Sequence, residues 1–187
     1  MSYLRFLRPG AREGSAPTGQ ETAAIRAISA RLEQMDPHRA AFLAGFAYLL
    51  GRVAYADLHI SADETVEMER IVRDFGGLDE PTAVLIVEIA KSQARLEGAT
   101  EDFLVARRFA EISTDDERER LMHCLFAVAS AAGDVITADE SHEIRQIAET
   151  LGYTLAELNV FRRRYADRLA ALRRPSGEVS RASDPPG

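Results

Sequence analysis

Ala54-Tyr-Ala-Asp57-Leu-His-Ile60-Ser61-Ala-Asp-Glu64 is the stretch that decides the fold, because the chain uses it twice. The second copy is Ser130-Ala-Ala-Gly133-Asp134-Val-Ile136-Thr137-Ala-Asp-Glu140. One offset of 76 residues maps Ile60 onto Ile136 and Glu64 onto Glu140, and it continues to Gly76 and Gly152. A repeat of this kind indicates a duplicated architecture.

Each copy is typical of one helix ending, a short acidic loop and a second helix beginning. Ser61-x-x-Glu64 and Thr137-x-x-Glu140 have the spacing of capping boxes. In such a box the hydroxyl accepts a hydrogen bond from a first-turn N–H, and the glutamate reaches back to the N–H of the cap residue. We expect Gly76 and Gly152 to supply the left-handed residue that ends each second helix.

The remaining pattern predicts an all-α fold, a bundle of about eight helices built from two pseudo-symmetric helix–loop–helix repeats. The repeats lie around residues 40–76 and 116–152, within a helical domain at 20–172. We expect the flanking segments, a basic one at 1–19 and a tail at 173–187, to be disordered.

Other helices of this bundle have local signals of their own. Thr114-x-x-Glu117 and Thr154-x-x-Glu157 are two more candidate capping boxes. Between the repeats, residues 100–112 predict a helix with three apolar side chains directed inward. These are Phe103, Leu104 and Phe109.

The composition limits the class of protein. Of the 187 residues 46% are apolar, which is ample for one core, and a single cysteine, Cys124, excludes an internal disulfide framework and fits a reducing cytoplasm. The net charge of −7 argues against a general nucleic-acid binder. We expect no signal peptide, because residues 1–9 lack a long apolar core and a cleavage site. We expect no transmembrane segment, because the most apolar window, at 40–56, contains Arg52 and is shorter than the roughly 20 residues that a bilayer requires.

Two basic segments leave alternatives open. Tyr3-Leu-Arg-Phe-Leu-Arg8 is either a frayed terminus or a weak anchor for a membrane surface or a partner. The run from Arg162 to Arg164 is either a solvated face or a docking site for an acidic partner or lipid headgroups. The expected location is cytoplasmic, with peripheral attachment at the inner membrane face as the alternative.

The acidic loops are candidates for a divalent cation. Asp57-x-x-Ile60-x-x-x-Glu64 matches the second half of an EF-hand pattern, and hard cations such as Ca²⁺, Mg²⁺ or Mn²⁺ prefer oxygen ligands. One loop offers too few ligands, so the candidate site combines Asp57 and Glu64 with Asp134 and Glu140. The alternative is a metal-free scaffold or interaction domain in which these acids serve only as helix caps.

Nothing in the sequence points to catalysis. The chain has no Gly-rich phosphate loop, no Cys-x-x-Cys, no His-Glu-x-x-His and no Gly-x-Ser-x-Gly. Cys124 lies in an apolar helical segment and is expected to be a core thiol. His59 and His142 are candidates to join a metal site, but helical carboxylate centres use Glu-x-x-His, whereas Asp139 precedes His142 by three residues.

The double acidic motif resembles the tellurite-resistance TerB family, which includes the TerB-like domain of DjlA-type co-chaperones. The family repeats Ala-x-x-Asp-Gly-x-Ile-Ser-x-x-Glu after an apolar helix, and the likeness covers about residues 38–170. It implies an all-helical bundle, acidic loops that bind a divalent cation, and a protein partner in a cytoplasmic or membrane-associated stress complex. Two departures bear on the cation site: Leu58 replaces the family's glycine, and Gly133-Asp134 inverts the Asp-Gly order.

Overall fold

The computed structural model describes residues 19–54, 62–93, 99–131 and 135–168, and within these ranges it is all-α. The described residues form eight α-helices and one short 3₁₀ helix, with no β-strand, so the predicted helical bundle is confirmed. The helices are α1 (Gly19–Glu33), α2 (Pro37–Ala54), α3 (Ala62–Gly76), α4 (Glu80–Gln93), α5 (Ala99–Ile112), α6 (Asp115–Ala131), α7 (Ala138–Thr150) and α8 (Leu155–Arg164), and the 3₁₀ helix is Ala166–Arg168.

Helix α2 and the C-terminal half of α6 contribute the largest shares of the core, because both are apolar around most of their circumference. The most buried large side chains of α2 include Phe46 and Leu50, and those of α6 include Leu121 and Phe126. Each such side chain contributes roughly 1.5–3 kcal/mol when it leaves water. The core therefore forms around two helices that belong to different halves of the chain.

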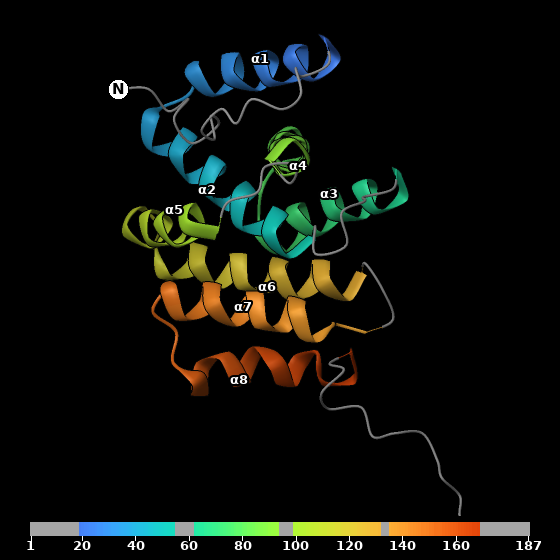
Figure 1. Cartoon of the computed structure of the whole chain (residues 1–187), viewed down its shortest axis with the longest axis vertical. Helices are drawn as coiled ribbons and strands as arrows, with labels where there is room; N and C mark the ends of the chain where they lie inside the picture. The colour runs from blue at the N-terminus through green and yellow to red at the C-terminus, as the bar shows by residue number, and fades with distance from the viewer. Residues whose placement is uncertain (1–18, 55–61, 94–98, 132–134, 169–187) are drawn as a thin grey trace, which may run out of the picture.

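The other helices pack around this pair (Figure 1). Helix α4 packs on α2 and α3, and α8 packs on α6 and α7, while α3 runs along α6. Helix α5 contacts both α2 and α7. Figure 1 shows α6, α7 and α8 lying one beside the next, with α1 at the opposite end of the molecule.

The helix-ending glycines differ from the prediction in one repeat. Gly152 has φ +92° directly after the C-cap of α7, as expected, but Gly76 is the last residue of α3 and the left-handed residue is Gly77, with φ +64°. The prediction for Gly76 was therefore wrong. The tandem Gly76-Gly77 allows α3 to continue one residue longer, and Gly76 is buried where a Cβ would lie 3.6 Å from the Cys124 sulfur.

The inward orientation predicted for α5 holds only for Phe109, which is buried. Phe103 and Leu104 are 57% and 58% exposed, so that prediction was wrong. The buried stripe of α5 passes through Val105, Ala106 and Phe109. At about 100° per residue, Phe103 and Leu104 lie roughly 115° and 145° around the helix from the centre of this stripe.

None of the helices in the described part of the chain is long and apolar enough to cross a membrane. This agrees with the expectation from the apolar window at 40–56.

Candidate functional site

The second acidic unit begins α7 with the predicted capping box. Thr137 is the N-cap, its hydroxyl accepts a hydrogen bond from the Glu140 N–H at 3.2 Å, and the Thr137 N–H donates to Glu140 Oε2 at 2.7 Å. Two backbone N–H groups that the helix itself cannot satisfy are thereby satisfied. The position of Glu140 is fixed by the start of α7.

Glu140 differs from the other capping glutamates in its burial. The boxes Thr114–Glu117 and Thr154–Glu157 also form, with Glu157 exposed and Glu117 half-buried. Glu140 is only 4% exposed. A carboxylate in such a place has lost most of its hydration, so it needs compensation by hydrogen bonds, the helix dipole or a cation.

The first acidic unit is only partly described. Glu64 lies in the first turn of α3 and is half-buried. Asp57, Asp134, His59 and the predicted cap residue Ser61 lie outside the described residues, so the distance between the two acidic loops is not defined. Within the described ranges, no group of three or more His, Cys, Asp or Glu side chains is arranged to hold a metal ion.

Glu143, one turn after Glu140, is used in a way that the sequence did not predict. It accepts two hydrogen bonds from Arg52 of α2, from Nε to Oε1 and from Nη2 to Oε2, both at 3.1 Å. The two side chains are 17% and 35% exposed, which makes this a half-buried, bidentate ion pair between two helices. The available signal was Arg52 itself, because a charge in an apolar helical window needs a partner.

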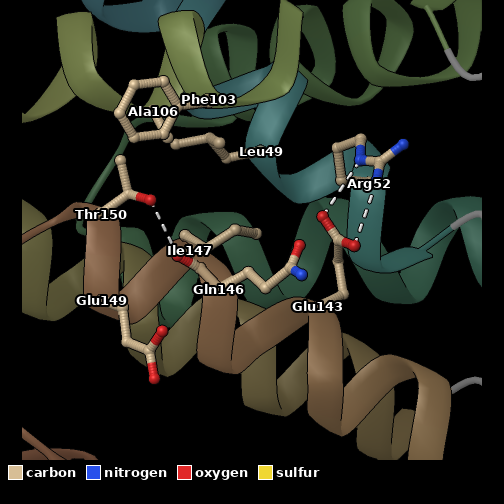
Figure 2. Close-up of a pocket in the computed structure, with 9 residues that line it drawn as sticks. All are labelled: Leu49, Arg52, Phe103, Ala106, Glu143, Gln146, Ile147, Glu149 and Thr150. Carbon is tan, nitrogen blue, oxygen red and sulfur yellow. Dashed lines mark hydrogen bonds and ion pairs between the residues drawn. The ribbon is translucent and has the colours of Figure 1, made fainter. Parts of the chain in front are cut away.

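A groove of about 500 Å³ lies next to this ion pair, between α2, α5 and α7 (Figure 2). Figure 2 shows the Arg52–Glu143 pair on one side and the Phe103 ring near Thr150 on the other. The Thr150 hydroxyl donates to the carbonyl oxygen of Gln146 at 2.9 Å. The lining residues are Leu49, Arg52, Phe103, Ala106, Glu143, Gln146, Ile147, Glu149 and Thr150.

Within the described residues, neither Cys124 nor a histidine joins the acidic unit in a group of three or more potential metal ligands. Cys124 is fully buried, as predicted for a core thiol, and burial raises its pKa to about 12. A thiol with so high a pKa is a poor nucleophile and metal ligand.

The two histidines described on α6 and α7 have different surroundings. His142 is exposed on α7, with its Nε2 2.9 Å from Gln146 Nε2. His123 packs its ring edge-to-face on Phe161 of α8, with the ring centroids 5.0 Å apart.

Comparison with known proteins identifies the family. The family model for tellurite resistance protein TerB matches residues 42–163, from the first turns of α2 to the end of α8, and so includes both acidic loops. Neither the curated proteins nor the solved structures provide a significant match. Because the matched region covers well over half of the chain and agrees with the double acidic motif, the chain belongs to the TerB tellurite-resistance family.

Proposed function

We propose that this chain is a non-catalytic TerB module that binds one divalent cation between its two acidic loops and docks on a protein partner in the response to tellurite or metal stress. The proposed ligands are Asp57, Glu64, Asp134 and Glu140, and the ions are Ca²⁺, Mg²⁺ or Mn²⁺. The proposed location is the cytoplasm, with peripheral attachment at the inner membrane face as the alternative.

The burial of Glu140 carries this proposal. The hydrogen bonds of its capping box use Oε2, so Oε1 is the oxygen that we assign to the cation. Glu117 and Glu157 perform the same capping role without such burial, so capping alone does not require it. A cation beside Glu140 would offset the loss of hydration that burial imposes on a carboxylate.

A shared ion needs the two loops to face each other, and we propose that the two repeats pack around a pseudo-two-fold axis. The support comes from which helices touch. The offset of 76 residues pairs α2 with α6, α3 with α7 and α4 with α8. Helix α3 packs on α6 while α2 packs on α7, and α4 and α8 each cover their own helix pair.

The first test is calorimetric titration of the metal-stripped protein with calcium, magnesium, manganese and zinc at several salt concentrations. We expect saturable binding of one ion per chain, with a dissociation constant on the order of micromolar. Asp57→Asn and Asp134→Asn should abolish it. The matched control is Asp139→Asn, which removes an exposed acid from the first turn of α7. Two ions per chain would contradict the shared site.

The second candidate, a metal-free scaffold whose acids only cap helices, is favoured by the capping boxes of α6 and α8, which form without an acidic loop. Glu140→Gln and Glu157→Gln separate the two functions. Both variants weaken a cap and should lower the melting temperature in the absence of metal. Only Glu140→Gln should also lose a calcium-dependent rise in melting temperature. If neither the wild type nor the variants respond to any of the ions, the scaffold is the correct function.

The cellular role is tested separately. A strain that lacks this gene should lose tolerance to tellurite and recover it with the wild-type chain. The Asp57→Asn/Asp134→Asn variant should fail to restore tolerance. Unchanged tolerance in the deletion strain would contradict the stress role without affecting the cation site.

A further inference from the structure

We propose that the groove between α2, α5 and α7 is a docking site for the segment Tyr3-Leu4-Arg5-Phe6-Leu7-Arg8 of the same chain. The groove lies beside the Arg52–Glu143 pair and uses none of the proposed cation ligands. It is therefore a second site whose occupancy does not depend on the proposed function. Docking would order a segment for which the sequence alone predicts no fixed structure.

The first argument is the apolar character of the groove. Leu49, Ala106 and Ile147 are each less than 5% exposed and form its buried part. The Phe103 ring lines the groove and is 57% exposed, so a docked apolar side chain can contact it and shield it from water. The volume of about 500 Å³ lies within the range of small binding pockets. The groove therefore suits one or two large apolar side chains, such as Phe6 and its neighbours.

The second argument is charge complementarity. The charged residues that line the groove are Arg52, Glu143 and Glu149, which leaves one net negative charge. The segment from Tyr3 to Arg8 carries two arginines and no acid. Glu143 is already bound by Arg52, and Glu149 accepts a hydrogen bond from Arg145 at 2.7 Å. Arginines of the segment would extend these networks, and the overall charge of −7 favours a cationic occupant over an anionic one.

The third argument is reach. Eleven residue steps separate Arg8 from Gly19, where α1 begins, and at most about 3.3–3.6 Å per step gives roughly 36–40 Å. A compact domain of about 150 residues has a diameter of roughly the same size. The tether can therefore deliver the segment to the groove of its own chain. A short tether of this kind also holds the segment at an effective concentration of about millimolar, so weak contacts suffice.

The test uses the full chain with a photo-crosslinking phenylalanine analogue in place of Phe6. After irradiation, digestion and mass spectrometry should find crosslinks from position 6 to peptides of α5 or α7 that contain Phe103 or Thr150. The crosslinked protein should keep the mass of a single chain. Circular dichroism of each variant checks that the helices remain folded.

A matched pair of variants shows whether the groove is responsible. Phe103→Ser should lower the crosslink yield about tenfold, since an exposed aromatic contact is lost. Leu104→Ser is the control, because Leu104 is equally exposed on the same helix but does not line the groove. Arg5→Glu/Arg8→Glu should also lower the yield, by reversing the charge of the segment.

Three results would overturn the proposal. Crosslinks at the mass of two chains would make a second copy the occupant. Crosslinks confined to helices other than α2, α5 and α7, or no crosslink within the chain, would place the segment elsewhere. An equal loss of yield in Phe103→Ser and Leu104→Ser would mean that the groove has no special role. None of these results depends on cation binding, so the two proposals fail separately.

Discussion

The contact between α3 and α6 and the contact between α2 and α7 occupy equivalent places in the sequence repeat, because the 76-residue offset pairs α3 with α7 and α2 with α6, yet they are built differently. Helix α3 packs extensively on α6, where the Cys124 thiol lies 3.8 Å from the carbonyl oxygen of Ile71. Helix α2 makes a smaller contact with α7, held by the Arg52–Glu143 pair and bordered by the groove. Helix α5, which lies between the repeats in sequence, packs on both α2 and α7. The groove lies where α5 packs against the contact between α2 and α7.

Two acids at equivalent positions of the sequence repeat also have different kinds of partner. The offset of 76 residues pairs Glu67 with Glu143. Glu67 bonds Arg70 three residues later on the surface of α3, and hydrogen bonds from Arg70 lower the pKa of Glu67. Glu143 instead joins two helices that are distant in sequence. A sequence repeat therefore specifies where helices begin, whereas the partner of each acid depends on which helix happens to face it.

The largest expected loss of stability comes from a substitution at the contact between α3 and α6. Ile71 is 2% exposed, so Ile71→Ala should lower the free energy of unfolding by roughly 2–5 kcal/mol. Val66 is on the same helix and 66% exposed, and Val66→Ala should cost under about 0.5 kcal/mol. Urea denaturation measures both. Similar losses in the two variants would mean that α3 does not use this face to pack on α6.

The second-largest expected loss of stability distinguishes Glu143 from Glu67, its equivalent in the first repeat. Glu143→Gln should lower the free energy of unfolding by roughly 1.5–3 kcal/mol, because it leaves a half-buried guanidinium with a weaker partner. Glu67→Gln removes an exposed pair and should cost about 0.3–0.5 kcal/mol. Double-mutant cycles with Arg52→Gln and Arg70→Gln measure the coupling energy of each pair. Equal coupling energies would remove the distinction between the two contacts.

Most of the helical framework could be predicted because its signals are local. The capping boxes at Thr114, Thr137 and Thr154 each involve residues three apart, so spacing alone identifies them. The repeat and the resemblance built on it predicted the family, which the match over residues 42–163 confirms. The proposed ligands Asp57 and Asp134 lie outside the described residues, so that part of the prediction remains a prediction.

Features that depend on packing between distant helices could not be predicted. Arg52 and Glu143 are 91 residues apart, and their contact exists only because α2 and α7 meet at that point. The exposure of Phe103 depends on the phase of α5, and three apolar residues in a short segment do not fix that phase. The error at Gly76 has a similar origin, because two adjacent glycines offered two helix ends with the same local signal.

The glycines provide the third prediction. Gly77→Ala should lower the free energy of unfolding by about 1 kcal/mol, because φ is +64° and the new Cβ would lie 2.5 Å from Nη1 of Arg120. Gly152→Ala faces open space and should cost slightly less, from its φ of +92° alone. Gly76→Ala is the control and should be close to neutral, since its Cβ would make only ordinary contacts. Thermal unfolding that ranks Gly76→Ala as the worst of the three would contradict the assignment of Gly77 as the helix end.

The smallest expected effect is a pH dependence of stability that arises from His123 of α6, which α8 covers in the second repeat. Burial lowers the pKa of His123, with a further contribution from Arg164 of α8, while Glu119, 3.7 Å from Nε2, partly opposes the shift. The Nδ1 atom is buried and has no hydrogen-bond partner among the described residues. Below the ordinary histidine pKa of about 6.5 the unfolded chain therefore binds more protons at His123 than the folded protein does.

The sign of the pH dependence follows from this difference. The free energy of unfolding should fall as the pH is lowered through about 6.5, and the fall should end once the pH is below the depressed pKa of the folded state. Urea denaturation between pH 7.5 and 5 measures it. His123→Gln should flatten the profile in this window, whereas His142→Gln, which changes an exposed histidine of α7, should leave it as in the wild type. A profile that His123→Gln leaves unchanged would mean that α8 packs on α6 independently of this imidazole.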